Sequence, residues 1–268
     1  MATPLGNLGD ISQRAVKILN RCPVIFAEDT RKAGMLLDLL GIRAKKFISL
    51  HEHNETGRIE QAARLVLSGT DCCLISDAGT PLVADPGYRL VRRFRQKGLP
   101  VIPVPGPCAP VTALMASGLP PYPFAFLGFL PRRQGQVEAL FRQWQNIQAT
   151  LIFFQRKNRV MDTLDWAFRI FGPREFCLAR ELTKKFEQFI MGTLGRTSLE
   201  PDLLQGEITV LISGVPPEKS RTPSREIQDL IAEYAPKGLK PRETARIISR
   251  ETTGWSTGEI YQMITTRD

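Results

Sequence analysis

Short apolar runs of strand length alternate with helix-like stretches along the first 112 or so residues of this chain. The candidate strands are residues 24–27, 46–50, 72–76 and 101–104, and the candidate helices are residues 11–20, 31–40, 55–67, 86–97 and 107–117. Such alternation predicts a mostly parallel sheet with right-handed crossover connections. Asp10 is the predicted N-cap of the first helix, and Gly41 and Gly98 are predicted to end two later helices.

A linker rich in Pro and Gly, residues 117–123, predicts a domain boundary, and a polar joint at residues 216–223 predicts another. Between them lies a second α/β segment, with candidate strands at residues 124–129, 150–154, 175–179 and 207–213. The predicted fold class is therefore α/β, with two α/β domains (residues 1–117 and 118–216) and a small helical C-terminal domain (residues 217–268).

The C-terminal domain, residues 217–268, carries clear helix signals. Pro241 suits a first helical position, and Ser256 with Glu259 forms a candidate capping box. A helix-turn-helix and a plain helical hairpin both fit this spacing, and the hairpin is the more common outcome.

The chain opens with a loop where this type of domain usually opens with a strand. Residues 2–8 look like the first ligand loop with no strand in front of them. Either the start codon is misassigned or this form lacks one strand of the sheet. We favour the first explanation as a hypothesis, which mass spectrometry of the native protein tests.

The net charge of +9, from 36 Lys and Arg against 27 Asp and Glu, favours a polyanionic partner such as nucleic acid. The alternative is a basic protein that binds no polyanion. Apolar runs are too short for a membrane helix, and no signal peptide is visible. The five cysteines lack CxxC spacing, which indicates a reducing compartment and hence a cytoplasmic protein.

Two loops rich in Gly and Pro follow predicted strands, at residues 76–87 and 104–109. Ligands bind beyond the carboxyl ends of parallel strands, so two such loops side by side predict the wall of a pocket. The first loop also carries Asp77 and Asp85. The chain has neither a Walker motif nor GxGxxG, which argues against phosphoryl transfer and gives no specific sign of a dinucleotide. Tight turns without a ligand are the alternative.

Three further polar clusters lie at strand ends. His51 and His53 suggest a metal, but zinc needs at least three protein ligands and the chain has no other His, so we expect no metal. Asp29 is suited to orient or deprotonate a hydroxyl and Arg31 to hold a phosphate, although Asp29 is equally suited to cap a helix.

In the second segment, Arg180 and Lys184 are suited to an RNA backbone and Glu181 to a polar anchor, with a solvated loop as the alternative. If the two domains face each other, one cleft would gather further basic side chains, namely Arg132, Arg133, Arg156, Lys157 and Arg159.

Eight segments that span about 185 residues carry a family resemblance: residues 2–8, 27–31, 51–55, 76–88, 105–107, 117–120, 128–131 and 179–184. In this order they resemble the ribosomal RNA small-subunit methyltransferase I family, a branch of the tetrapyrrole methylase superfamily. The resemblance implies methyl transfer from S-adenosylmethionine to the ribose 2′-hydroxyl of a cytidine in the decoding region of 16S rRNA. It also implies a homodimer of chains with two α/β domains, the donor between them, and the small ribosomal subunit as partner.

The resemblance extends to individual residues. It implies that the methyl donor contacts a set of small and apolar residues in three loops, namely Pro4, Leu5, Ala78, Gly79, Thr80, Val83, Pro107, Cys108 and Ala109. The family usually has Ser where Cys108 stands, and a backbone contact should survive this change. For the chemistry we expect Asp29 or Glu181 to assist the hydroxyl, with Arg31 and Lys184 positioning phosphate.

Residues 154–159 depart from the family, which usually reads Tyr-Glu-Ser/Ala-Pro-His-Arg there. This chain reads Phe-Gln-Arg-Lys-Asn-Arg, so a carboxylate is lost and two positive charges are gained. We hypothesise that this loop relies more on phosphate contacts. Two rivals stay open: a methyltransferase for a tetrapyrrole or other small molecule, and a non-catalytic RNA-binding relative.

Overall fold

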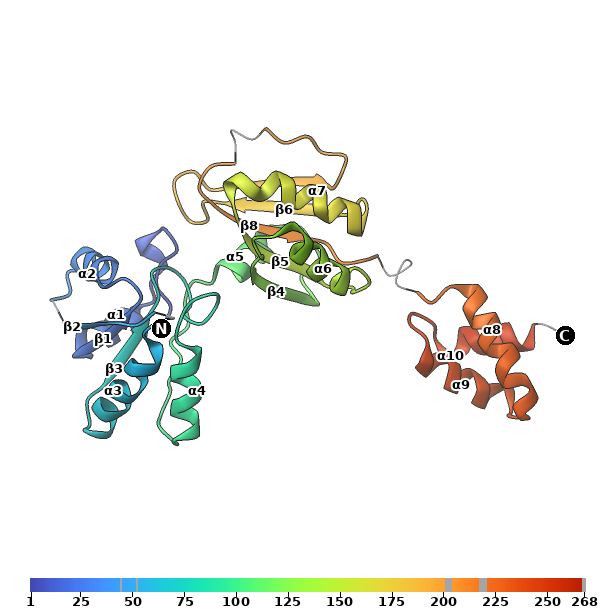
Figure 1. Cartoon of the computed structure of the whole chain (residues 1–268), viewed down its shortest axis with the longest axis horizontal. Helices are drawn as coiled ribbons and strands as arrows, with labels where there is room; N and C mark the ends of the chain where they lie inside the picture. The colour runs from blue at the N-terminus through green and yellow to red at the C-terminus, as the bar shows by residue number, and fades with distance from the viewer. Residues whose placement is uncertain (44, 52, 201–203, 217–220, 267–268) are drawn as a thin grey trace.

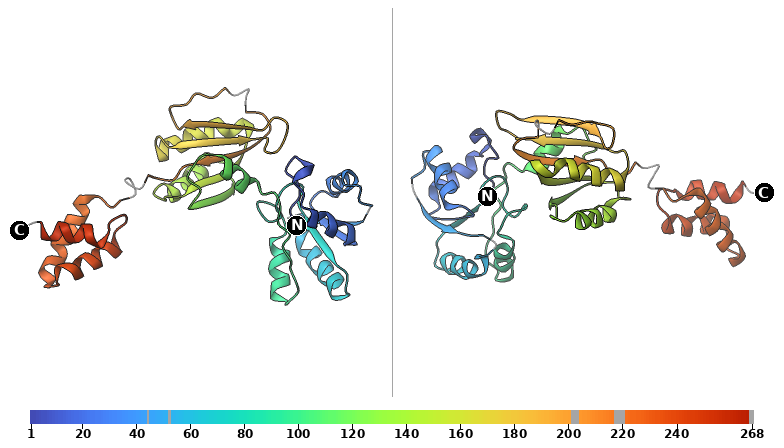
Figure 2. Two further views of the ribbon diagram at one scale, coloured as in Figure 1. Left: turned by 180° about the vertical axis from the view of Figure 1, so that it is seen from behind. Right: turned by 45° about the horizontal axis from the view of Figure 1, so that its top comes forward.

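The computed structural model describes residues 1–43, 45–51, 53–200, 204–216 and 221–266. Figure 1 shows three groups of elements: an N-terminal α/β group, a middle group built on a larger sheet, and a helical group at the C-terminal end. The further views in Figure 2 show the helical group set apart from the other two. None of the described helices is both long and apolar enough to cross a membrane.

The N-terminal group is a parallel three-stranded sheet between two layers of helices. Its elements are η1 Leu8–Asp10, α1 Gln13–Arg21, β1 Val24–Ala27, α2 Thr30–Leu39, β2 Lys46–Ser49, α3 Glu55–Leu67, β3 Cys72–Ile75 and α4 Tyr88–Gln96. The described strands lie in the order β2-β1-β3. One face packs on α1 and α2 through residues such as Leu19 and Leu37, and the other packs on α3 and α4 through Ile59 and Leu90. β1 is buried throughout, as expected for a parallel strand covered on both faces.

Two sequence predictions for this group were wrong. Asp10 does not cap α1, because it lies in η1 and the hydroxyl of Ser12 accepts from the Ala15 amide instead. Residues 101–104 form no strand, because no described strand lies beside them and Pro103 lacks an N–H. Gly41 and Gly98 do follow helix ends with φ of +67°, as predicted.

The middle group is a mixed sheet in the order β4-β5-β8-β6-β7. Its elements are α5 Ala109–Ala116, β4 Phe124–Phe129, α6 Gln134–Trp144, β5 Thr150–Arg156, η2 Lys157–Arg159, α7 Val160–Phe171, β6 Glu175–Arg180, β7 Gln188–Thr193 and β8 Glu207–Ile212. Helices α6 and α7 cover one face, and α5 packs on the other through Ala113 and Leu114. β7 was not predicted from the sequence, because this edge strand has exposed Gln188 and Met191 and its pattern lacks a clear apolar face.

The C-terminal group contains α8 Ser224–Tyr234, η5 Ala235–Lys237, α9 Pro241–Glu251 and α10 Thr257–Thr265. Its own core is formed by Ile227, Ile231, Ala245, Ile248 and Ile260. Pro241 begins α9, and the capping box of Ser256 with Glu259 is present, as predicted. Three described helices thus pack together, which is more than a plain hairpin. The joint at residues 217–220 lies outside the described residues, and the domain boundaries near 117 and 216 stay a prediction.

Candidate active site

A cavity of about 850 Å³ opens between the carboxyl edge of the N-terminal sheet and the middle group. The N-terminal side contributes Leu5, Glu28, residues 77–80 and residues 83–85. The other walls contribute Cys108, Ala109, Pro110, Phe129, residues 154–158, Leu182 and residues 206–209. Both Gly/Pro loops therefore line one cavity, as the sequence predicts.

Hydrogen bonds tie three loops together at this cavity. Thr3 and Gly79 exchange two backbone bonds, of 2.8 and 3.1 Å. The Thr80 hydroxyl donates to the Pro107 carbonyl at 2.8 Å. Gly79 has φ of +76°, and a Cβ there would meet Leu5 at 3.0 Å, so the close approach requires glycine. The loop beyond Gly79 also holds Leu82 and Ala84 at positive φ, a strained conformation of the kind that clusters at ligand sites.

Carboxylates form one wall of the cavity. Asp77 accepts from the Asp29 amide at 3.0 Å and from Lys32 Nζ at 2.8 Å. Burial raises the pKa of Asp85 to about 6, although a hydrogen bond with the Ser76 side chain acts in the opposite direction and lowers it. The nearby charges of Glu28 and Asp77 raise it further. Asp85 has no role predicted from the sequence, because its burial is not visible there.

Asp29 caps α2 at the rim and does not line the cavity. Its carboxylate accepts from the Arg31 amide at 2.9 Å and from the Arg31 guanidinium at 2.7 and 3.1 Å. These bonds hold the pKa of Asp29 well below its usual range. An acid that gives up its proton so readily is a weak base, so Asp29 is better placed to orient Arg31 than to take a proton.

Glu181 and Lys184 form a network at the opposite rim. Glu181 Oε1 accepts from the Glu207 amide at 2.9 Å and from Lys184 Nζ at 3.1 Å, and both bonds lower the pKa of Glu181. Burial lowers the pKa of Lys184, but its bonds to Glu207 and Glu181 outweigh this and raise it. The stem of Lys184 lies where a Cβ on Gly6 would be, so this network touches the first loop of the chain.

The middle group contributes an aromatic wall. Phe129 is 62% exposed at the cavity, and its ring centroid lies 5.2 Å from that of Phe154. In the divergent loop Gln155 is only 5% exposed, and its amide donates to the Thr163 hydroxyl at 2.7 Å. Gln155 therefore supports α7, and the next residues, Arg156, Lys157 and Asn158, are the exposed polar groups of this loop at the cavity.

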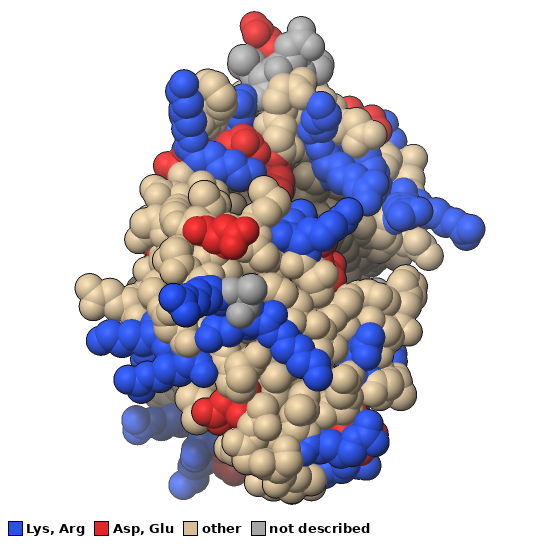
Figure 3. All heavy atoms as spheres, turned by 90° about the vertical axis from the view of Figure 1, so that its left-hand side faces the viewer, with Lys and Arg blue, Asp and Glu red and all other residues tan. Residues whose placement is uncertain are grey.

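The basic residues of the second segment have different surroundings. Arg159 donates to the carbonyls of Pro131 and Arg132, at 3.0 and 2.9 Å, and so holds the loop before α6. Lys157 donates to Gln205 at 2.6 Å. Figure 3 looks onto the N-terminal group, where Lys and Arg side chains cover much more of the surface than Asp and Glu do.

The pair His51 and Glu55 is structural in the described residues. The Asn54 amide contacts His51 Nε2 at 3.0 Å, and buried Glu55 accepts from the Leu90 amide at 3.1 Å. Glu52 lies outside the described residues. No cluster of three His, Cys, Asp or Glu suited to a metal occurs in the described part of the chain.

The predicted site residues divide between the cavity and its surroundings. Those that line it are Leu5, Ala78, Gly79, Thr80, Val83, Cys108, Ala109, Arg156 and Lys157. Those outside its lining are Pro4, Asp29, Arg31, Pro107, Arg132, Arg133, Arg159, Arg180, Glu181 and Lys184. Glu28, Asp85, Phe129 and Glu207 line the cavity without having been assigned a role from the sequence.

Comparison with known proteins identifies the family of this chain and similar folds. A model of the tetrapyrrole (corrin/porphyrin) methylases matches residues 2–197. The solved structure of the methyltransferase CobJ covers 79% of this chain and 91% of its own, with a TM-score of 0.60 and 16% identity. A uroporphyrin-III-C-methyltransferase from Thermus thermophilus has the same coverage, with a TM-score of 0.51 and 17% identity. The chain belongs to the tetrapyrrole methylase family.

Three relatives that match almost the whole chain bear the name ribosomal RNA small subunit methyltransferase I. The protein of Micromonospora olivasterospora is 38% identical over 265 residues, or 98% of this chain and 84% of the relative. That of Haemophilus influenzae is 36% identical over 273 residues (98% and 94%), and that of Halalkalibacterium halodurans 37% over 269 residues (98% and 92%). Within the tetrapyrrole methylases, the chain is a member of this branch, which confirms the resemblance seen in the sequence.

Proposed function

We propose that this protein transfers a methyl group from S-adenosylmethionine to the 2′-hydroxyl of a cytidine in the decoding region of 16S rRNA, in the cytoplasm. The observation that carries the proposal is the 850 Å³ cavity, walled by the two Gly/Pro loops on one side and by an exposed aromatic and basic wall on the other. The names of the relatives support RNA as the substrate class.

The cavity fits the methyl donor in size and chemistry. Small-molecule sites usually have volumes of about 300–1,000 Å³, with mostly apolar walls and a few polar groups. Leu5, Val83 and Leu182 supply apolar surface, and Glu28, Asp77 and Asp85 supply a few polar groups. When bound, S-adenosylmethionine supplies an electrophilic methyl group on a sulfonium centre.

The chain's own residues would bind and orient the acceptor nucleotide. Phe129 offers an exposed ring at the cavity, on which a base unstacked from RNA can stack. Arg156 stands beside it as a contact for phosphate. Lys184, fixed by two carboxylates at the other rim, is placed to hold a second phosphate, with Arg31 opposite.

The acceptor hydroxyl must lose its proton as the new carbon–oxygen bond forms and the carbon–sulfur bond breaks. Asp85 lines the cavity and has a pKa raised to about 6 by burial, so it is poised to take that proton near neutral pH. Asp29 and Glu181 both have lowered pKa values and would serve as orienting acceptors. Replacing each with its amide would test the assignment: Asp85→Asn should slow turnover most.

A homodimer is part of the proposal. On the face of the middle sheet that α5 covers, Met115 of α5 is 81% exposed, and Phe124 and Met191 are also exposed near the sheet's two edges. Such a strip of large apolar side chains suits an isologous contact with a second copy. Sedimentation of the protein at several concentrations would measure the association.

The decisive experiment supplies methyl-labelled S-adenosylmethionine and small ribosomal subunits from a strain that lacks its own enzyme. We expect label in the RNA, recovered as 2′-O-methylcytidine after digestion. Donor binding without label in RNA would contradict the proposal and favour a small-molecule acceptor or a non-catalytic role. Free 16S rRNA serves as the parallel substrate, which shows whether the assembled subunit is needed.

A further inference from the structure

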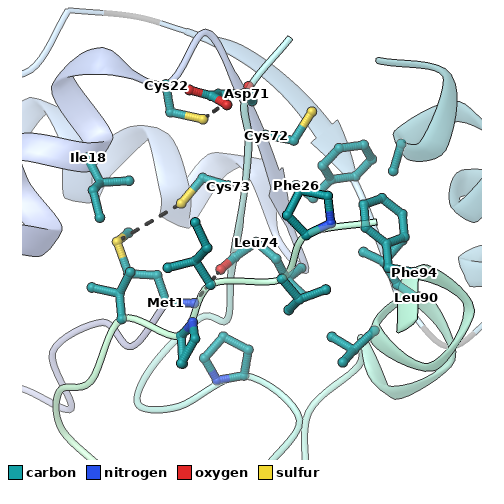
Figure 4. A pocket seen from close by; sticks show the side chains of 18 of the residues that line it. Met1, Ile18, Cys22, Phe26, Asp71, Cys72, Cys73, Leu74, Leu90 and Phe94 are labelled. Atoms are coloured by element: carbon teal, nitrogen blue, oxygen red, sulfur yellow. Dashed lines mark hydrogen bonds between the residues drawn. The ribbon is translucent and has the colours of Figure 1, made fainter. Parts of the chain in front are cut away.

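The C-terminal helical group, residues 221–266, contributes neither to the candidate active site nor to a second cavity of about 690 Å³. Both cavities are lined by residues between 1 and 209. Figure 4 shows the second one beside Leu74 of β3, with apolar side chains such as Phe26 and Leu90 around it. Figures 1 and 2 show the helical group set apart from the other two groups. Any part that this group takes in binding must therefore come from its outer surface.

The charges of the helical group are nearly balanced in number but unevenly divided between its helices. Residues 221–266 hold seven Lys and Arg against six Asp and Glu. Helix α8 carries three acidic residues and one arginine, whereas α9 carries three arginines and two glutamates. The arginines of α9 are Arg242, Arg246 and Arg250. The small net charge of the group therefore includes a local excess of positive charge on α9.

The three arginines form one row along α9. They are spaced four residues apart, so they lie on the same side of the helix, with a rise of about 6 Å from one to the next. All three are exposed, while α9 packs Ala245 and Ile248 into the core of the group. Within the part of the chain that the structure describes, none of the three side chains forms an ion pair or donates a hydrogen bond. The whole row is therefore open to a ligand.

A row of like charges is unfavourable for the helix alone, because like charges four residues apart destabilise it. Only Arg250 lies in the last turn, where the helix dipole favours a cation. Glu251 accepts from the Tyr234 hydroxyl of α8 at 2.8 Å, and exposed Glu243 forms no ion pair with the described side chains. Helix stability thus does not account for the row. A polyanion along it would interact with all three guanidinium groups, which suit phosphate oxygens.

An exposed aromatic ring lies next to this row. Ser249 follows Arg246 by three residues, and its hydroxyl lies 3.0 Å from that of Thr257, so this bond joins the row's side of α9 to the start of α10. Tyr261 follows Thr257 by four residues, on the same side of α10, and is 41% exposed. Arginine for the backbone and an aromatic ring for an unstacked base are the groups with which proteins hold RNA.

We propose that Arg242, Arg246, Arg250 and Tyr261 form a second RNA-binding surface, the α9 face, which holds a segment of ribosomal RNA away from the reacting nucleotide. This inference rests on the proposed function for its substrate class, RNA, and adds where that substrate is anchored. Because the helical group is set apart from the candidate active site, the α9 face would add affinity without touching the reacting atoms. Its loss should therefore raise KM for the RNA and leave kcat unchanged.

The test measures binding of the full chain to protein-free 16S rRNA and to small ribosomal subunits over a range of salt concentrations. The row variant combines Arg242→Gln, Arg246→Gln and Arg250→Gln. Its matched control removes the same charge from three exposed arginines on separate parts of the chain, by Arg169→Gln, Arg196→Gln and Arg225→Gln. A further variant, Tyr261→Leu, removes the ring. The midpoint of thermal unfolding shows that each variant is folded, and the row variant should keep it, since its arginines lie outside the core.

We expect the row variant to bind both RNA probes about tenfold more weakly and to flatten the slope of log affinity against log salt by about 2, at ~0.7–0.9 for each phosphate contact. The control should keep the parent slope. Tyr261→Leu should bind several-fold more weakly at an unchanged slope, because stacking on a ring is not ionic.

The same slope for the row variant and its control would overturn the proposal, as would full affinity of Tyr261→Leu. Weaker binding of the row variant to subunits, with unchanged binding to protein-free 16S rRNA, would indicate an acidic protein partner and would also overturn it. Methylation is measured in parallel with the same RNA. A parent protein that binds RNA through the α9 face but does not methylate it would contradict the proposed function and leave this inference standing.

Discussion

Thr80 joins the two Gly/Pro loops through a single hydroxyl, which donates to the Pro107 carbonyl at 2.8 Å. Thr80→Val keeps the shape of the side chain and removes this bond, at a cost of about 1 kcal/mol. Because the two loops lie side by side in the cavity wall, we expect the affinity for S-adenosylmethionine to fall about fivefold in calorimetric titration. Thr265→Val makes the same change at an exposed position on α10, so this matched control should bind the donor normally. Equal affinities for the two variants would show that the loops hold together without this bond.

Asp85 makes the stability of the protein depend on pH. Its pKa in the folded chain is raised to about 6 by burial, above its usual value of about 3.9 in an unfolded chain. The stability that comes from its protonated form is complete below pH ~4 and is lost as the pH rises through about 6.

Asp85→Asn should therefore raise the midpoint of thermal unfolding at pH 8 and change it little at pH 4. Asp165→Asn, at an exposed position on α7, is the control for loss of one negative charge. A difference between Asp85→Asn and the parent protein that is the same at both pH values would contradict the assignment.

The turn between β6 and β7 contains Glu181, whose side chain packs against Gly206. Gly206, just before β8, has φ of +87°, and a Cβ there would lie 2.2 Å from Glu181 Oε1. Gly206→Ala would push Glu181 away from Lys184 and from the Glu207 amide. Gly98→Ala is a close control, because Gly98 has φ of +67° and nothing within 4 Å of its added Cβ.

Both variants should lose about 1 kcal/mol of unfolding free energy from the positive φ alone, measured by urea denaturation. Gly206→Ala should in addition reduce RNA methylation several-fold. If the two variants lose the same stability and neither loses activity, the Glu181 network has no part in the reaction.

Where sequence patterns predicted elements well, the signal was local. β1 and α3 have the predicted bounds, because short apolar runs and helix starts are written in neighbouring residues. Residues 101–104 were wrongly predicted as a strand because strand formation needs a partner, which their own sequence does not reveal. β7 was missed because an edge strand lacks the continuous apolar run of a buried one.

The candidate site shows the same limit. The Gly/Pro loops were predicted to meet, and they do: the first follows β3, and its Thr80 hydroxyl donates to the Pro107 carbonyl of the second. Asp85 and Phe129 were not assigned a role, since their positions at the cavity depend on burial and on the middle group. Arg159 donates to two carbonyls of its own chain, which its sequence position did not indicate; its contact with RNA stays a prediction.

The salt dependence of RNA affinity tests whether Arg156 and Lys157 contact phosphate. Each phosphate contact contributes a slope of ~0.7–0.9 to the dependence of log affinity on log salt. Replacing Arg156 and Lys157 together with Gln should weaken RNA binding and flatten that slope by about 1.5. The control replaces Arg89 and Arg92, at exposed positions on α4, with Gln, which removes the same charge outside the cavity lining. Equal slopes for both double variants would mean that net charge, and not this loop, attracts the RNA.

The placement of the cysteines gives the protein a built-in reporter. Cys108 is partly exposed and lines the cavity, whereas Cys22, Cys73 and Cys177 are buried. Burial raises the pKa values of Cys72 and Cys177 to about 11, which keeps these thiols protonated and slow to react. A thiol-reactive dye should therefore couple first at Cys108, and a molecule held in the cavity should shield it. The rate of labelling would then follow occupancy of the cavity in solution, without a radioactive donor.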